Sequence, residues 1–486
     1  MTPRPDSSAP ATTAAASRRV ERAVARLACA MAIFVMGGCG GSAYPSVGVR
    51  EPRAPHLRAG IHPWARPRPT RTTRPATVDP AVVTRVSLDD ILTYADSRAP
   101  ALYVARATRA RVGAARTAAR PALPDNPVVE LSGGPRIASG STGVDLEIGA
   151  TQAIEVSGER GRRLAAAERL AELTEAEIEL ARWAVHCDVH AAFHRAIVLR
   201  ERATLAVRVL AFQEEVGSVV ARRIAAGDAA PLAARIAQLE VAQARQSSVA
   251  ATQAYVAARL DLAQLAGWPI TRPPEPIGQL DPPRAPPPLD DLLRVAAQRQ
   301  PAIRLRRTAI REARSRVAVA DREASVRPAL GVRYQVEGLG AAEGTQHVVL
   351  GVLELPIPAF RRNQGERARA RADVVVAEAE HRAAMATVRA SVARARAAVV
   401  AAAERVRSYG IDVLPRVEDT IAQLGRSFEL GEIDLLDVLV ARERFLRIQS
   451  DVLDAQLDYF VALAELERAA GVEIWPDDHL HQEPAR

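Results

Sequence analysis

Three histidines at intervals of four residues are the side chains whose type and spacing point most directly to chemistry. His186, His190 and His194 share one face if this segment is an α-helix. Histidines one helical turn apart can chelate zinc or copper through their ring nitrogens. The spacing therefore predicts a metal site. The alternative is a polar stripe, hydrogen-bonded or solvated, within a helical assembly.

Motifs of catalysis are missing from the sequence. It contains no G-x-S-x-G elbow, no H-E-x-x-H zinc motif and no C-x-x-C pair. It also contains no lysine, which excludes a P-loop lysine and a Schiff-base lysine. We therefore expect neither an enzyme activity nor a catalytic cofactor.

The distribution of charge argues against nucleic acid as a partner. The formal net charge is +8, and the first 80 residues hold 12 arginines and four acidic residues. The excess therefore lies in this N-terminal part, and the remainder is electrically balanced. A nucleic-acid-binding domain would carry its basic excess in the folded part.

The N-terminus resembles a bacterial secretory signal. Arginines precede a short apolar run, Leu27–Met36, which is followed by Gly37, Gly38 and Cys39. This ending resembles a lipobox, so we expect residues 1–39 to form the signal peptide and Cys39 to carry an N-terminal lipid. Residues 40–80 are rich in proline and arginine and are predicted to be an extended tether.

The mature chain contains an internal repeat. Leu88–Leu92 recurs as Leu289–Leu293, a shift of 201 residues, and Gly227-Asp228 recurs as Gly431-Glu432, a shift of 204. The boundaries that follow are a first repeat at 81–268, a proline-rich linker at 269–288, a second repeat at 289–472 and a tail at 473–486.

Each repeat has the same predicted order: a helix, two strands, a very long helix and a shorter returning helix. The strands are recognised by alternation of apolar and polar residues, and the long helices by runs with little Gly or Pro. The predicted ranges are helices at 87–121 and 288–325, strands at 127–133, 143–156, 328–337 and 346–357, and long helices at 159–226 and 363–430, with the returning helices ending near 266 and 470.

These elements predict an α+β membrane protein. Helices of such length pack as an antiparallel coiled coil rather than in an ordinary domain. Four strands per chain cannot close a transmembrane barrel, which needs at least eight. Several copies of the chain would therefore have to combine their strands around a polar lumen.

Several motifs resemble the outer-membrane efflux protein family, the TolC-like channels. They include Thr151–Glu155 with Gly158–Arg162 in the first repeat, Leu355–Pro358 in the second, and the helical turn Phe428–Leu439. The resemblance covers about residues 80–472. It implies a homotrimer with a 12-stranded barrel in the cell outer membrane and a helical tunnel in the periplasm, joined by a periplasmic adaptor to an inner-membrane transporter.

Two further stretches, Arg362–Gly365 and Gly267–Pro269, resemble the cobalt–zinc–cadmium efflux branch of that family. This resemblance implies divalent heavy-metal cations as cargo and a transporter of the RND type. Multidrug efflux and type I secretion remain alternatives with the same fold. A lipid-anchored periplasmic coiled-coil scaffold without a pore is the alternative from another class.

The resemblance also assigns the two helical turns to the periplasmic tip, where the adaptor binds. Glycine permits the tight reversal between two helices. The predicted contact residues are Arg223, Gly227, Asp228, Gly431, Glu432, Leu435 and Leu436. Asp434 and Asp437 could form acidic rings at a pore constriction, since such rings favour cations; helix capping and ordinary surface charge are the alternative.

Overall fold

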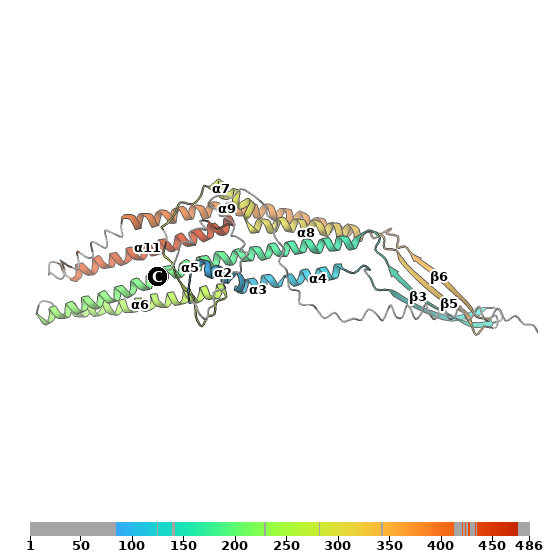
Figure 1. Cartoon of the computed structure of the whole chain (residues 1–486), viewed down its shortest axis with the longest axis horizontal. Coiled ribbons are helices and arrows are strands. Elements are labelled where there is room, and N and C mark those ends of the chain that lie inside the picture. The colour runs from blue at the N-terminus through green and yellow to red at the C-terminus, as the bar shows by residue number, and fades with distance from the viewer. Residues whose placement is uncertain are drawn as a thin grey trace, which may run out of the picture. The chain divides into compact units, whose positions relative to one another are not determined.

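The computed structural model (Figure 1) describes most of the chain after the predicted signal and tether. The described residues are 84–123, 125–138, 141–227, 230–280, 282–341, 344–412, 420, 423, 426–427, 433 and 435–474. The predicted lipidation site Cys39, the signal peptide and the tether lie outside them.

The first helical segment is divided into three helices: α2 (Leu88–Arg98), α3 (Pro100–Ala107) and α4 (Arg109–Ala119). Ser87 and Asp90 form a capping box that starts α2. The prediction of one helix at 87–121 is therefore wrong. Proline lacks an N–H and restricts the residue before it, so α2 ends and α3 begins at Pro100.

The corresponding later segment has the same kind of break. It consists of α7 (Leu289–Arg299) and α8 (Pro301–Glu323), with Pro301 as the first residue of α8. The prediction of one helix at 288–325 is therefore also wrong, and again a proline divides it. Gln300 caps α8 because its side chain accepts a hydrogen bond from the Ala302 N–H.

Four strands form an antiparallel sheet in the order β2-β3-β5-β6. Their bounds are β2, Val128–Ala138; β3, Ser141–Ala153; β5, Ala329–Leu339; and β6, Gln346–Glu354. All four predicted strands are confirmed, although β2 extends beyond residue 133 and β3 ends before residue 156. A second sheet pairs the short strands β1 (Arg85–Val86) and β4 (Glu275–Pro276) in parallel.

Long helices follow each strand pair (Figure 1). The helix α5 (Glu159–Ala225) has 67 residues, which at 1.5 Å per residue is about 100 Å. Helix α6 (Pro231–Ala266) returns along α5, and α9 (Gln364–Asp412) packs against α11 (Leu435–Ala470). Beyond Asp412, the predicted helix at 363–430 continues into residues that are mostly outside the described part.

Two buried clusters hold these helices together. One contains Phe193, Ile197 and Trp268 and joins α2 to α5 and α6. The other contains Val392, Phe460 and Leu466 and joins α7 and α9 to α11. Many of the remaining members are alanine and valine, which permit close approach of the helices.

Glycine ends both returning helices where another backbone passes close by. Gly267, at the end of α6, has φ +72°, and a Cβ at this position would lie 2.1 Å from the Arg98 carbonyl oxygen. Gly471, just after α11, has φ +74°, and its Cβ would lie 2.5 Å from the Gln300 Cα. Both positions need glycine for conformation and for space. None of the described helices combines the length and apolar character needed to cross a membrane.

Candidate functional site

One face of the four-stranded sheet carries a network of ion pairs. The register places Glu130 of β2, Gly149 of β3 and Arg333 of β5 in one row. Arg333 lies 2.8 Å from Glu147 and 3.8 Å from Glu130, and the Gln335 amide donates to Glu147 at 2.6 Å. These side chains come from three strands and are partly enclosed by one another.

The network continues toward the β2–β3 turn. Arg136 of β2 lies 3.1 Å from Glu337 of β5 and 3.8 Å from Asp145 of β3. Asp145 also accepts a hydrogen bond from the Gly338 N–H at 2.8 Å. This face can therefore interact with water and ions along several residues of each of the three strands.

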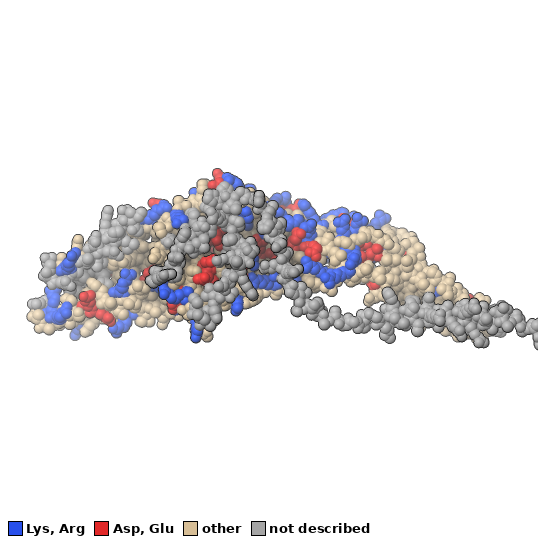
Figure 2. Space-filling model, in the orientation of Figure 1, with Lys and Arg blue, Asp and Glu red and all other residues tan. Residues whose placement is uncertain are grey.

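The opposite face of the same sheet is apolar and exposed. Leu131, Ile148, Tyr334 and Val349 lie opposite one another across all four strands. Leu131 is 81% exposed, Ile148 48% and Val349 60%. On the face shown in Figure 2, the strand region carries few charged residues, whereas charges are spread over the helices. Large apolar side chains that share one exposed face are unusual on a water-soluble monomer.

The predicted tip residues are only partly described. Gly227 has φ +83° and follows α5, whose last turn contains Arg223. Ile433, just before α11, packs on a cluster of Val216, Val220 and Ala237 from α5 and α6. The regions around both turns therefore meet. Asp228, Gly431, Glu432 and Asp434 lie outside the described residues, and of Leu435, Leu436 and Asp437 only the backbone, at the start of α11, is described.

The histidine stripe meets two glutamates from the end of the chain. His190 Nδ1 lies 2.7 Å from Glu467 Oε2, and both side chains are almost completely buried. His186 Nε2 lies 3.2 Å from Glu473 Oε1, and these side chains are 7% and 12% exposed. Glu467 belongs to α11, so the contact joins α5 to a helix 277 positions away in sequence.

Burial and neighbouring charges shift the pKa values of His190 and Cys187. Burial alone would lower the pKa of His190, but the charge of Glu467 and its hydrogen bond outweigh burial and raise this pKa. Burial also raises the pKa of the Cys187 thiol.

His194 lies beside His190, with ring centroids 4.8 Å apart. Its Nδ1 lies 3.1 Å from the His190 carbonyl oxygen of its own helix, and its ring stacks on Phe460 with centroids 4.2 Å apart. The three histidines therefore share one helix face, and the ring nitrogens of His186 and His190 lie within 4.8 Å of a carboxylate oxygen of Glu467. The structure adds Glu467 and Glu473, which no local sequence signal connects to the stripe.

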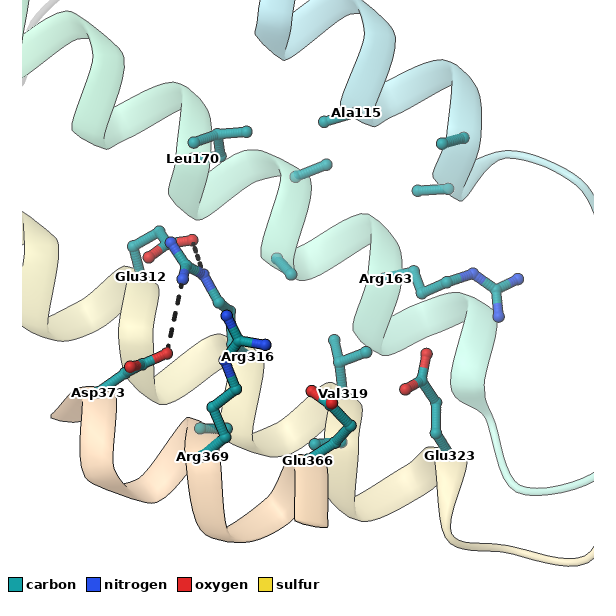
Figure 3. A pocket seen from close by; sticks show the side chains of 16 residues that line it. Ala115, Arg163, Leu170, Glu312, Arg316, Val319, Glu323, Glu366, Arg369 and Asp373 are labelled. Atoms are coloured by element: carbon teal, nitrogen blue, oxygen red, sulfur yellow. Dashed lines mark hydrogen bonds and ion pairs between the residues drawn. The ribbon is translucent and has the colours of Figure 1, made fainter. Parts of the chain in front are cut away.

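A groove of about 530 Å³ lies between α4, α5, α8 and α9 (Figure 3). Seven of its sixteen lining residues are alanine and seven are charged. Arg316 lies 2.6 Å from Glu312 and 3.9 Å from Asp373, as the dashed lines in Figure 3 show. We assign no chemistry to this groove.

Comparison with known proteins agrees with this architecture. Residues 292–472 match the family model described as outer membrane efflux protein. The chain is 28% identical over 325 residues to the cobalt-zinc-cadmium resistance protein CzcC of Cupriavidus metallidurans. That alignment covers 65% of this chain and 73% of CzcC.

Solved structures share the fold at low identity. The outer membrane protein VceC of Vibrio cholerae is 18% identical, with a TM-score of 0.59, over 79% of this chain and 96% of VceC. The CmeC outer membrane channel of Campylobacter jejuni is 14% identical, also with a TM-score of 0.59, over 81% of this chain and 87% of CmeC. Residues 292–472 thus match the outer membrane efflux protein model, the chain is similar to CzcC, and its fold is shared with these two outer-membrane proteins.

Proposed function

We propose that this protein is the outer-membrane channel subunit of a tripartite efflux system and conducts its cargo passively from the periplasm to the outside. The observation that carries the proposal is that the sheet exposes its apolar face, the reverse of what is expected of a water-soluble protein. Its charged face is partly enclosed by its own ion pairs, and its apolar face is exposed. A membrane-spanning barrel around a water-filled lumen needs this arrangement.

The number of strands supports a homotrimer. Strands β2 and β6 are the two edges of the sheet, and unpaired edges are too costly in lipid. Three copies of a four-stranded sheet supply twelve strands, an even number above the minimum of eight for a bacterial barrel. The long helices of three chains would then form the periplasmic tunnel.

An internal two-fold repeat of the chain is supported by its two glycine joints. Gly267 approaches Arg98 just before Pro100, and Gly471 approaches Gln300 just before Pro301. The two glycines are 204 positions apart and the two prolines 201, the same shifts that relate the sequence motifs. The two halves thus use the same joint between a returning helix and a proline-started helix.

The helical end remote from the sheet is the proposed site of adaptor binding. Ile433 packs near the α5–α6 turn, which supports a common tip for both turns. The proposed contact residues are Arg223, Gly227, Asp228, Gly431, Glu432, Leu435 and Leu436. We further propose that Asp434 and Asp437 face the pore there, where acidic rings would favour cations.

For the cargo we propose divalent heavy-metal cations, supplied by an inner-membrane transporter of the RND type. The support is the similarity to a protein named for cobalt, zinc and cadmium resistance. A lipid on Cys39 would anchor the N-terminus to the outer membrane.

The channel itself is tested with purified protein. We expect heat-resistant trimers in detergent and conductance in planar bilayers. Monomeric protein without conductance would instead support the coiled-coil scaffold.

The cargo is tested in cells that lack the gene. We expect sensitivity to zinc, cobalt or cadmium that the intact gene reverses, with a dye and a detergent as control toxins. Sensitivity to the dye and the detergent alone would assign the channel to multidrug efflux.

A further inference from the structure

The buried contact between α5 and α11 has the composition of a metal site. The donor atoms of His186, His190 and Glu467 lie within 4.8 Å of one another, and all three side chains are buried. Glu473 adds a second carboxylate, 3.2 Å from His186 Nε2. Two imidazole nitrogens and two carboxylate oxygens are ligands that zinc accepts in tetrahedral sites.

We propose that His186, His190 and Glu467, with Glu473 at the rim, bind a divalent cation of the zinc class that joins α5 to α11. The proposed ion is a resident of the protein wall and not its cargo. The inference therefore stands whether the channel exports metals, drugs or proteins.

The orientation of the donors supports this assignment. Glu467 Oε1 accepts a hydrogen bond from the Ile474 N–H at 2.9 Å, which leaves Oε2 directed at His190. The His186 ring stacks on Trp183 at a centroid distance of 5.0 Å and an interplanar angle of 7°. Neighbouring groups that fix ligand orientation are typical of metal centres.

The spacing of the donors is close to what an ion requires. Bonds of about 2.0–2.2 Å in a tetrahedral site place the donors about 3.3–3.6 Å apart. The nitrogen–oxygen pairs at 2.7 Å and 3.2 Å must open slightly, and the widest separation, up to 4.8 Å, must shrink by side-chain rotation. The ion would replace the hydrogen that His190 and Glu467 now share.

The four members of the proposed site differ in their exposure to solvent. Glu467 is completely buried, whereas Glu473 is 12% exposed and His186 7%. An ion would therefore enter past Glu473 and His186 and reach His190 and Glu467 last. A site closed by protein ligands in this way suits a structural role.

The test uses the full-length, untagged protein in detergent, stripped of metal with a chelator. We expect isothermal titration with Zn²⁺ to give one ion per chain, and Co²⁺ to give the intense visible bands of a tetrahedral site. His186→Gln should weaken Zn²⁺ binding at least tenfold and abolish those bands. His194→Gln, one turn further along the same helix, should leave both unchanged.

Two measures keep the outcome interpretable. Glu473→Gln changes the most exposed member of the site and should also weaken binding, so the test does not depend on the folding of His186→Gln. The C-terminal histidines are replaced in a fourth variant, His479→Ala with His481→Ala, to remove binding by the tail. The site would be overturned if the wild-type protein bound no ion. It would also be overturned if His186→Gln and Glu473→Gln bound Zn²⁺ as tightly as the wild type. Neither result would bear on conductance or trimer formation, which test the proposed function.

Discussion

The sheet and the α5–α11 contact both place charged side chains in pairs, but their surroundings are opposite. At the α5–α11 contact, His190 and Glu467 are enclosed by the protein. In the sheet, Arg333 and Glu147 remain about one third and one quarter exposed, while apolar side chains face outward on the other side. The buried contact is complete within a single chain, whereas the proposed function would surround the sheet with lipid and pair its edges with further copies.

This difference determines what a substitution should cost. A buried pair is enclosed by neighbours that cannot replace a missing partner, so its disruption is expensive. In a partly exposed pair, water can solvate the charge that remains when its partner is removed, so the disruption costs little stability. The apolar face of the sheet differs from both, because introducing a charge there should reduce stability only if the face lies in lipid.

The largest effect is expected from Glu467→Ala. It removes the partner of His190 and the acceptor of the Ile474 N–H, so the free energy of unfolding should fall by about 3–5 kcal/mol. Chemical denaturation of the detergent-solubilised protein measures it. Glu465→Ala, on the exposed side of the same helix, should cost less than about 1 kcal/mol. Equal losses in both variants would break the distinction between the two environments.

A smaller loss is expected when a charge enters the apolar face of the sheet. Leu131→Arg should cost about 2–4 kcal/mol if this face meets the middle of the bilayer. Ser132→Arg is the matched control, because its side chain lies on the charged face opposite Glu147. The yields of heat-resistant oligomer in the outer-membrane fraction are compared. Similar yields of the two variants would contradict a lipid-facing role for Leu131.

The charged face should influence ion selection more than stability. Arg333→Gln leaves Glu147 and Glu130 without their guanidinium, so the lumen of the proposed barrel should become more negative and more selective for cations. Reversal potentials under a salt gradient across a planar bilayer measure this shift, and stability should change by less than about 1 kcal/mol. Arg447→Gln, on the exposed side of α11, should leave the reversal potential unchanged. A shift of the same size in both variants would remove Arg333 from the lumen.

The sequence predicts the sheet better than the helical joints. Strand alternation depends on neighbouring residues, and all four strands were located from it within a few positions. The breaks at Pro100 and Pro301 were missed, although proline is a local signal, because the apolar pattern continues across both. The close approaches at Gly267 and Gly471 involve residues roughly 170 positions away and had no signal of their own.

The histidine cluster shows the same limit more sharply. The spacing of His186 and His190 correctly predicts one helix face. It also suggests His194, whose ring instead stacks on Phe460. Glu467 could not be recognised, because it is one of several acidic residues on α11 and only packing selects it. Periodicity identifies the face of a helix, but tertiary contacts decide which residues on it share a site.

The smallest effect is expected from the exposed pairs between α4 and α5, which extend the comparison to water-facing charges. The hydrogen bond from Arg116 lowers the pKa of Glu168, and that from Arg109 lowers the pKa of Glu175. A carboxylate whose pKa is lowered by folding adds stability above its unfolded pKa, about 4.3, and loses it as the pH falls through the folded value.

Arg116→Gln should therefore lower the melting temperature slightly at neutral pH. The gap from the wild type should close as the pH falls below about 4, because protonated Glu168 no longer gains from the arginine. Arg382→Gln, an exposed arginine of α9, serves as the control. A gap that persists at low pH would mean that Arg116 acts through packing of its alkyl chain. Packing, and not charge alone, would then contribute to the stability of exposed pairs, as it does at the buried contact.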